Sequence, residues 1–141
     1  MKIEAKKLHR DAKLPTRAHE GDAGLDLYAL RGIMLGPGER TSVPTGIAIA
    51  VPAGHVGLIM DRSGLAAKHG ITTLGGVIDS NYRGEWGIIM LNTSDAAYEV
   101  VPGERVAQML VVPIAYPEVC EVAELDDTIR GEGRFGSTGK T

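Results

Sequence analysis

Short runs of branched apolar residues, separated by proline and glycine turns, set the pattern of this chain. The turn signals are the tetrapeptides GPGE at 36–39, VPTG at 43–46, VPAG at 51–54 and VPGE at 101–104. Four apolar runs have the length and composition of strands, and they span 47–51, 56–60, 87–91 and 105–112. The first of these runs alternates isoleucine or valine with alanine. The pattern therefore predicts a mostly β chain.

One segment departs from the strand pattern. Residues 63–70 read SGLAAKHG, with a serine suited to an N-cap, helix formers, basic residues in the last turn and a terminating glycine. We expect a short helix there, with Ser63 as its cap. Close turns without a long helical pattern favour a sandwich, jelly roll or barrel over a doubly wound α/β fold. The predicted fold is one all-β domain over 1–129, either a sandwich, a jelly roll or a barrel, followed by a tail over 130–141.

The bulk properties narrow the classes of function. A chain of 141 residues can bury one adequate core, and 43% hydrophobic residues make it too apolar for a disordered protein. Its net charge of -3 provides no general positive field, so a nucleic-acid partner is not expected. Cys120 is the only cysteine, which excludes an intrachain disulfide. With no signal peptide and no membrane-length apolar run, we expect a cytoplasmic protein with no membrane partner.

The tail supports two interpretations. Residues 130–140 read RGEGRFGSTGK, with four glycines, and composition alone favours a frayed end. However, the segment also carries the only phenylalanine of the chain, two hydroxyl groups and three basic residues. That set is suited to stacking on a base and to contacting phosphates.

Two internal clusters can carry chemistry. At 61–64, Arg62 and Ser63 head the expected helix and could bind an anion, although a helix cap and a solvated arginine explain this tetrapeptide better when it is taken alone. Residues 75–86 read as a β-hairpin with Asp79 and Asn81 in its turn. A carboxylate there is ionised at neutral pH and can accept a proton from water, and Tyr82 would supply a flat surface.

Other catalytic arrangements have little support. The four histidines are scattered without metal-ligand spacing, and the chain has neither a P-loop nor a nucleophile elbow. Zinc and covalent catalysis are therefore not expected. Four methionines are expected to fill the core, namely Met34, Met60, Met90 and Met109, and Trp86 is expected to pack within or beside its strand.

Taken in order, five segments resemble the five motifs of the trimeric dUTPase family and cover nearly the whole chain. They are GDAGLDLYA at 21–29, DRSGLAAKHG at 61–70, GGVIDSNYRGEWG at 75–87, PGERVAQM at 102–109 and RGEGRFGSTG at 130–139. The resemblance implies a homotrimer of jelly-roll-like domains with active sites between subunits. It also implies hydrolysis of dUTP to dUMP and pyrophosphate with Mg²⁺, which keeps uracil out of DNA and supplies dUMP for dTTP synthesis.

The resemblance assigns roles in the third motif. Asp79 matches the aspartate that activates water for attack on the α-phosphorus. Tyr82 matches the tyrosine that stacks on deoxyribose and excludes a 2′-hydroxyl. Uracil would be read by main-chain groups of the surrounding segment, at Gly76, Val77, Ile78 and Gly87.

The other motifs imply phosphate and metal contacts. The phosphate contacts of the second and fourth motifs fall on Arg62, Ser63, Gly64, Arg105 and Gln108. Asp26 matches an aspartate that holds water around the magnesium ion, which is bound mainly by the triphosphate. In the last motif, supplied by the arm of a neighbouring subunit, Phe135 would stack on uracil. The arm residues that would reach the phosphates are Arg130, Gly136, Ser137 and Thr138.

Three positions depart from the family pattern. Relatives often have glycine at the place of Arg134 and proline at that of Asp61, and some have asparagine at that of Thr73. An acidic side chain beside a triphosphate is unfavourable unless Asp61 points away or pairs with Arg62. Two other functions are compatible with the fold: a dCTP deaminase, and a non-catalytic nucleotide-binding or regulatory protein. The aspartate–tyrosine segment and the complete RGxGxFGSTG tail argue against the deaminase.

Overall fold

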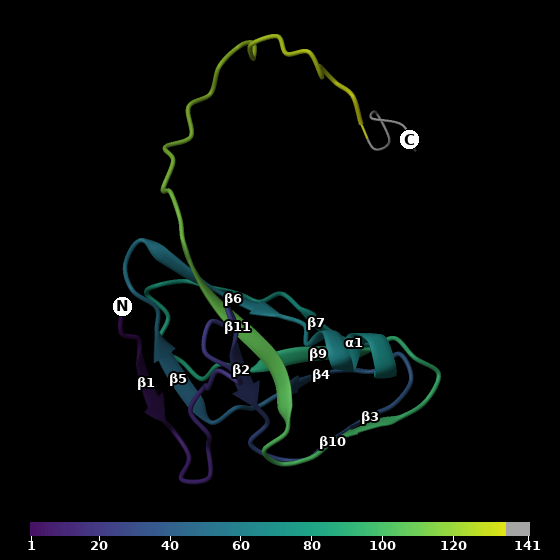
Figure 1. The fold of residues 1–141 in the computed structure, drawn as a ribbon. Coiled ribbons are helices and arrows are strands. Elements are labelled where there is room, and N and C mark those ends of the chain that lie inside the picture. Colours follow the sequence, from purple (N-terminus) through teal and green to yellow (C-terminus); the bar gives the residue numbers. More distant parts are fainter. Residues whose placement is uncertain (135–141) are drawn as a thin grey trace.

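A computed structural model describes residues 1–134 of the chain and shows antiparallel sheets with one short helix (Figure 1). The four-stranded sheet has the order β2 (Leu25–Tyr28), β11 (Arg105–Pro113), β6 (His55–Met60) and β8 (Val77–Ile78). The three-stranded sheet has the order β4 (Arg40–Val43), β9 (Ile88–Asn92) and β7 (Ile71–Leu74). Two strand pairs complete the described part, β1 (Glu4–Lys7) with β5 (Ile47–Ala50) and β3 (Ile33–Leu35) with β10 (Tyr98–Val100). The all-β prediction is confirmed, and these sheets do not close into a barrel.

The four predicted apolar runs all form strands, namely β5, β6, β9 and β11, with small shifts at their ends. The prediction missed the shorter strands. Sequences such as RTSV in β4 and ITTL in β7 contain too few apolar residues for a clear alternating pattern. These strands form because their backbones pair with β9, which lies between them.

One apolar cluster joins the two larger sheets. It takes Leu27 and Met109 from the four-stranded sheet and Val43, Ile88 and Met90 from the three-stranded sheet. The sheets therefore share a core, and in β9 the alternate residues Ile88 and Met90 point into it. Trp86, which lies just before β9, is fully buried in the same cluster.

The prediction of a core position was wrong for two of the four methionines. Met34 and Met60 are exposed, whereas Met90 and Met109 are fully buried. Met34 lies on the outward face of β3, between half-buried Ile33 and buried Leu35. Met60 is the last residue of β6. In each case the strand's register, rather than residue type, decided the burial.

The predicted helix is α1 (Ser63–His69), and its end is as expected. Gly70 adopts a left-handed conformation at φ 64°, and its N–H donates to the Ala66 carbonyl. The predicted cap was wrong, because Ser63 is already the first helical residue and Arg62 occupies the N-cap position. No side chain caps this end by a hydrogen bond.

The segment after β8 turns at Asp79, as predicted, with the Tyr82 N–H donating to the Asp79 carbonyl at 3.1 Å. The expected hairpin pairing was wrong. β8 pairs with β6, whereas β9, the strand after the turn, pairs with β4 and β7 in the other sheet. The turn thus carries the chain from one sheet to the other.

Beyond Pro113 the chain leaves the body as a long arc (Figure 1). Residues 114–134 contain no helix or strand, and apolar side chains such as Val119, Leu125 and Ile129 are exposed there. The extended segment thus begins at 114, before the boundary expected at 130. Phe135, Gly136, Ser137 and Thr138 lie outside the described residues. Within residues 1–134, no helix is long and apolar enough to cross a membrane.

Replacing Gly57 with alanine should destabilise the fold. A Cβ at this position would lie 2.6 Å from Trp86 Cη2 and 3.2 Å from Val51 Cγ2. Because both side chains are buried, we expect a loss of about 1–3 kcal/mol in the free energy of unfolding. Urea unfolding measures it. Gly36→Ala is the control, since its Cβ would meet only the end of the Glu39 side chain, at 3.4 Å; equal losses in the two variants would contradict the prediction.

Candidate active site

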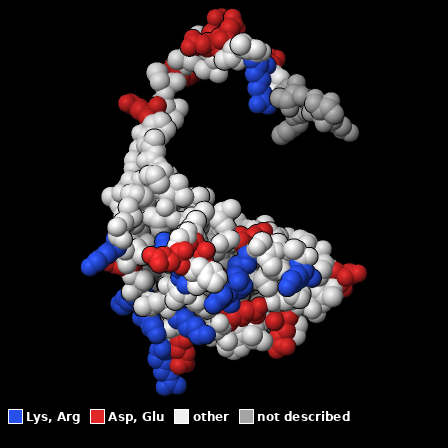
Figure 2. Space-filling view, in the orientation of Figure 1, with Lys and Arg blue, Asp and Glu red and all other residues white. Residues whose placement is uncertain are grey.

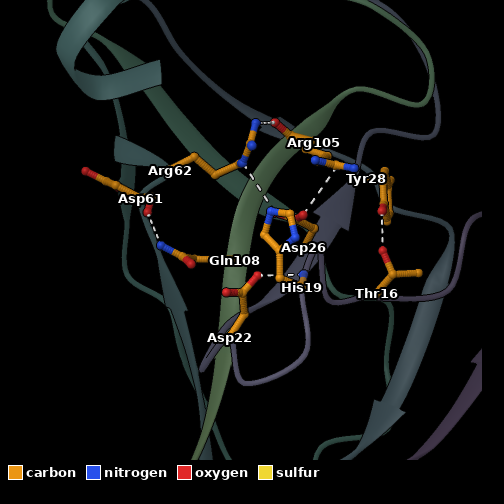
Figure 3. A network of polar contacts seen from close by, with 9 residues as sticks. All are labelled: Thr16, His19, Asp22, Asp26, Tyr28, Asp61, Arg62, Arg105 and Gln108. Carbon is orange, nitrogen blue, oxygen red and sulfur yellow. Dashed lines mark hydrogen bonds and ion pairs between the residues drawn. The ribbon is translucent and has the colours of Figure 1, made fainter. Parts of the chain in front are cut away.

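A cavity of about 860 Å³ opens where β6 leads into α1, opposite β2 and β11. Figure 3 shows the polar side chains around it. The cavity contains five of the residues expected to bind phosphate and the one expected beside magnesium. These six are Asp26, Arg62, Ser63, Gly64, Arg105 and Gln108.

Asp26 organises the positive charge of this cavity. Its Oδ1 lies 3.3 Å from Arg62 Nε and its Oδ2 lies 3.3 Å from Arg105 Nε. The Asp26 side chain is only 13% exposed, against 33% for Arg62 and 45% for Arg105. Arg62 Nη1 also donates to the Arg105 carbonyl at 3.1 Å. One carboxylate therefore holds two guanidinium groups together, leaving a net positive charge and further N–H donors.

Gln108 links β11 to the turn before α1. Its Nε2 donates to the Asp61 carbonyl at 2.8 Å, and on the other side Gln108 lies opposite Asp26 of β2. Gly24 makes room for it, because a Cβ there would lie 2.4 Å from Gln108 Oε1. A side chain at position 24 would displace the amide from the cavity wall.

The Asp61 carboxylate points away from Arg62 (Figure 3) and toward β7. Its Oδ1 accepts from Thr73 N and Thr73 Oγ1, both at 2.6 Å, and its Oδ2 accepts from Thr72 Oγ1 at 2.7 Å. Burial by itself would raise the pKa of this carboxyl, but these hydrogen bonds outweigh burial and hold the pKa below its usual range. Their contribution to stability is present at neutral pH and is lost as the pH falls through the lowered pKa.

A second carboxylate shapes the turn before Arg105. Glu104 Oε2 accepts from the Val101 N–H at 3.0 Å, and Glu104 Oε1 accepts from the Tyr98 hydroxyl. Burial, and then the neighbouring Glu104, raise the pKa of Tyr98 well above its usual range. Tyr98 therefore stays protonated and keeps donating to Glu104, which fixes the turn from which Arg105 enters β11.

The residues expected to activate water and to hold the nucleoside are not in this cavity. None of residues 76–87 lines it, and both Asp79 and Tyr82 are exposed. Tyr82 donates to the Glu85 carbonyl at 3.0 Å and lies so close to Gly84 that a Cβ there would be 2.3 Å from its hydroxyl. Asp79 follows β8, at one edge of the sheet, whereas Asp26 lies on β2 at the other edge. Three strand spacings separate these edges by roughly 14 Å.

The main-chain groups expected to read uracil are partly occupied. The Gly76 carbonyl accepts from the Ile59 N–H at 2.8 Å, so it is used within the sheet. Val77 and Ile78 pair with Leu58 and Gly57 of β6 on one side only, because β8 is an edge strand. An edge strand leaves half of its N–H and carbonyl groups directed outward. Such groups are available to a ligand or a second copy.

Sequence reasoning missed the loop that forms the near wall of the cavity. Ala18, Asp22, Ala23 and Gly24 all line it. Asp22 shapes this loop: its Oδ2 accepts from the His19 N–H at 2.9 Å, and its carbonyl accepts from Arg17 Nε at 2.8 Å. Gly24 was the available signal, since a glycine directly before a strand indicates close approach of another group. Arg130 lies on the extended arm and donates to the Gly133 carbonyl at 3.2 Å, not to any residue of the cavity.

Comparisons with known proteins identify the family of this chain. The family model described as dUTPase matches residues 10–139. A deoxyuridine 5'-triphosphate nucleotidohydrolase from Nautilia profundicola is 45% identical over 99% of this chain and 100% of its own. A variant dUTPase of Staphylococcus bacteriophage 80alpha, solved with dUpNHpp, superimposes with a TM-score of 0.93 at 32% identity over 98% of both chains.

The solved structure of a third similar protein describes a metal ion. A variant dUTPase from phage phi11 of S. aureus, whose structure describes the coordination of a structural Mg(II) ion, has a TM-score of 0.84. It is 28% identical over 90% of this chain and 100% of its own. The family model covers nearly all of the sequence, and the bacterial relative is well above 30% identical over its full length. This chain belongs to the dUTPase family.

Proposed function

We propose that this protein hydrolyses dUTP to dUMP and pyrophosphate, and so keeps uracil out of DNA and supplies dUMP for dTTP synthesis. The observation that carries the proposal is the cavity in which Asp26 holds Arg62 and Arg105 together beside Gln108. Two adjacent guanidinium groups suit a triphosphate because each presents several N–H donors in one plane. The relatives named for this reaction supply the identity of the base and the sugar.

Phosphate binding uses residues from one copy of the chain. Arg62 and Arg105 each engage Asp26 through Nε, which leaves guanidinium donors for phosphate oxygens. Ser63 and Gly64 line the same cavity at the start of α1, and no side chain caps that end. Gln108 adds an amide on the β11 side. Because α1 has only seven residues, the arginines supply most of the positive charge.

The donor set fits magnesium held mainly by the substrate. Among residues 1–134, no group of three His, Cys, Asp or Glu side chains could hold a metal ion. Magnesium commonly keeps several waters and binds through phosphates and one or two carboxylates. Each Asp26 oxygen takes one guanidinium and keeps a lone pair for a metal-bound water. When bound, Mg²⁺ would neutralise charge on the phosphates and on the departing pyrophosphate.

Asp79 and Tyr82 would come from a second copy of the chain. Within one copy they lie on the opposite edge of the sheet from Asp26, and a general base must lie within about 3 Å of the water that it activates. A homotrimer with sites between copies would bring Asp79 to the phosphate cavity of a neighbour. The outward main-chain groups of Val77 and Ile78 in β8, with those of Gly87 before β9, would pair with uracil while the Tyr82 ring packs on deoxyribose.

The arm would complete the site from a further copy. Residues 114–134 carry exposed apolar side chains that no other part of residues 1–134 covers, with Val119 93% exposed, which suits a segment that lies on a neighbour. Figure 2 shows acidic side chains along this arm, and the stretch from Glu118 to Asp127 has five acids and no Lys or Arg. That stretch is unsuited to phosphates. Phosphate contacts of the arm would therefore start at Arg130 and continue at Gly136, Ser137 and Thr138, with Phe135 on uracil.

Discrimination against dCTP and the location of the protein complete the proposal. Main-chain groups that match the carbonyl and N–H of uracil stay unpaired against cytosine, and such mismatches discriminate by roughly 10⁴. We place the protein in the cytoplasm.

Product analysis on four nucleotides tests the proposed reaction. We expect dUMP and pyrophosphate from dUTP, with turnover of dCTP, dTTP and UTP lower by at least about 10³. Chromatography and a pyrophosphate assay measure the products. Ammonia release from dCTP would instead indicate a deaminase. Absence of any turnover beside tight dUTP binding would indicate a non-catalytic nucleotide-binding protein.

Mixed oligomers test whether the site is shared between copies. We expect Asp79→Asn to bind dUpNHpp normally and to lose about 10² to 10⁴ in kcat. We expect Arg62→Ala to lose activity through weak triphosphate binding. Co-expressed in equal amounts, the two variants should regain about a quarter of wild-type activity, because each site then draws Arg62 and Asp79 from different copies.

The control is Asp95→Asn co-expressed with Arg62→Ala, which changes an exposed acid of another loop. The activity of this control mixture depends only on the number of sites with an intact Arg62, whether or not a site is shared between copies. If Arg62 and Asp79 served one site from the same copy, every mixed site would lack one of them. The mixture with Asp79→Asn would then remain inactive, contrary to the prediction.

Removing the tail after residue 129 should separate folding from catalysis. The described core ends with β11 at Pro113, so residues 1–129 should keep the thermal stability of the full chain. Without Arg130 and the residues beyond it, kcat/KM for dUTP should fall by about 10² or more. Steady-state kinetics and a thermal melt measure the two properties. Unchanged kinetics would remove the tail from the proposed site.

A further inference from the structure

The Asp61 carboxylate accepts three hydrogen bonds that no role assigned so far requires. Thr73 N, Thr73 Oγ1 and Thr72 Oγ1 donate to it at 2.6, 2.6 and 2.7 Å. Asp61 directly follows β6 and precedes Arg62, the N-cap residue of α1, and both threonines come after Gly70, which terminates the helix. The contacts therefore join the point where the chain leaves the four-stranded sheet, after β6, to the point where it enters the three-stranded sheet, in β7.

Asp61 is also held from the opposite side. Its carbonyl accepts from Gln108 Nε2 at 2.8 Å. Gln108 belongs to the four-stranded sheet, whereas Thr72 and Thr73 belong to the three-stranded sheet. The residue that precedes Arg62 is thus fixed by both sheets at once, and Arg62 leaves it with extended backbone angles of φ -87° and ψ 119°.

Two departures from the family motifs meet in this contact. A proline at position 61 would stiffen the turn through its ring. Here hydrogen bonds from β7 restrain the turn instead, and Thr73, the second departure, supplies two of the three. The Thr73 hydroxyl is thereby engaged with Asp61, although its side chain borders the cavity.

We propose that Asp61 is a positioning residue, whose carboxylate fixes the turn so that Arg62 and Ser63 face the phosphates of the substrate. The role rests on the proposed function, since it requires a triphosphate in the cavity. If only charge mattered, removing Asp61 would have the opposite effect and strengthen phosphate binding. A carboxylate on the cavity wall repels phosphate, so its loss would tighten binding if it did not hold the turn. The sign of the change distinguishes the two effects.

The test compares the affinities of dUpNHpp and deoxyuridine by calorimetry. Asp61→Ala should weaken dUpNHpp binding about tenfold and leave deoxyuridine binding unchanged. Asp61→Asn keeps an acceptor for both Thr73 donors and should recover most of the affinity. Asp22→Asn is the matched control, because it removes a carboxylate from the same cavity while keeping an acceptor for the His19 N–H. It should tighten dUpNHpp binding.

A double variant tests the coupling. Thr73→Val should weaken dUpNHpp binding less than Asp61→Ala, and the double variant should bind no more weakly than Asp61→Ala alone. Additive losses, unchanged affinity or tighter binding in Asp61→Ala would overturn the role. If Asp61→Ala does not fold, Thr73→Val and Thr72→Val test the role instead, since each removes one hydroxyl group and keeps the shape of the side chain. If neither variant loses affinity for dUpNHpp, the role of Asp61 is overturned.

Because binding rather than turnover is measured, the two proposals fail separately. A wild-type chain that binds dUpNHpp but does not hydrolyse dUTP contradicts the proposed function alone. Equal dUpNHpp affinities in wild type and Asp61→Ala contradict the role of Asp61 alone.

Discussion

The Asp26 carboxylate, held between Arg62 and Arg105, is the contact on which the arrangement of the site depends. Two guanidinium groups placed this close would repel each other, and a carboxylate with 13% exposure would be poorly solvated by itself. The Asp26 carboxylate offsets the repulsion between the two guanidinium groups, and the guanidinium groups offset the poor solvation of the carboxylate. The three residues come from β2, from the turn before α1 and from the start of β11. One ion cluster with a net positive charge therefore brings three parts of the chain to the same cavity.

The second constraint is the distance between the two parts of the proposed active site, Asp26 on β2 and Asp79 after β8. β11 and β6 lie between the strand that bears Asp26 and the strand that leads to Asp79. Antiparallel pairing holds these edges apart, because strand spacing in a sheet varies little. A rigid sheet cannot fold Asp79 back onto its own cavity. The proposed homotrimer would solve this problem, since the edge of one copy could meet the cavity of the next.

The arm follows the same reasoning. It leaves the body after Pro113 and carries exposed apolar side chains with a stretch of acids (Figures 1 and 2). Fixing such a segment costs about 1 kcal/mol or more per residue in conformational entropy. A neighbour's surface can offset that cost for the apolar part, and a bound triphosphate for the basic end. Assembly and substrate would thus order different portions of one segment.

The sequence by itself determined the elements whose signals are local. Branched apolar runs specified β5, β6, β9 and β11, and the run of helix formers ending at Gly70 specified α1. The segments that carry the phosphate-binding residues were also identifiable from their order along the chain. Only the tertiary structure decided which of these residues meet. Asp61 contacts Thr73, Asp79 lies apart from Arg62, and Met34 and Met60 face solvent because strand pairing and register bring distant positions together or hold them apart. No local pattern encodes that register.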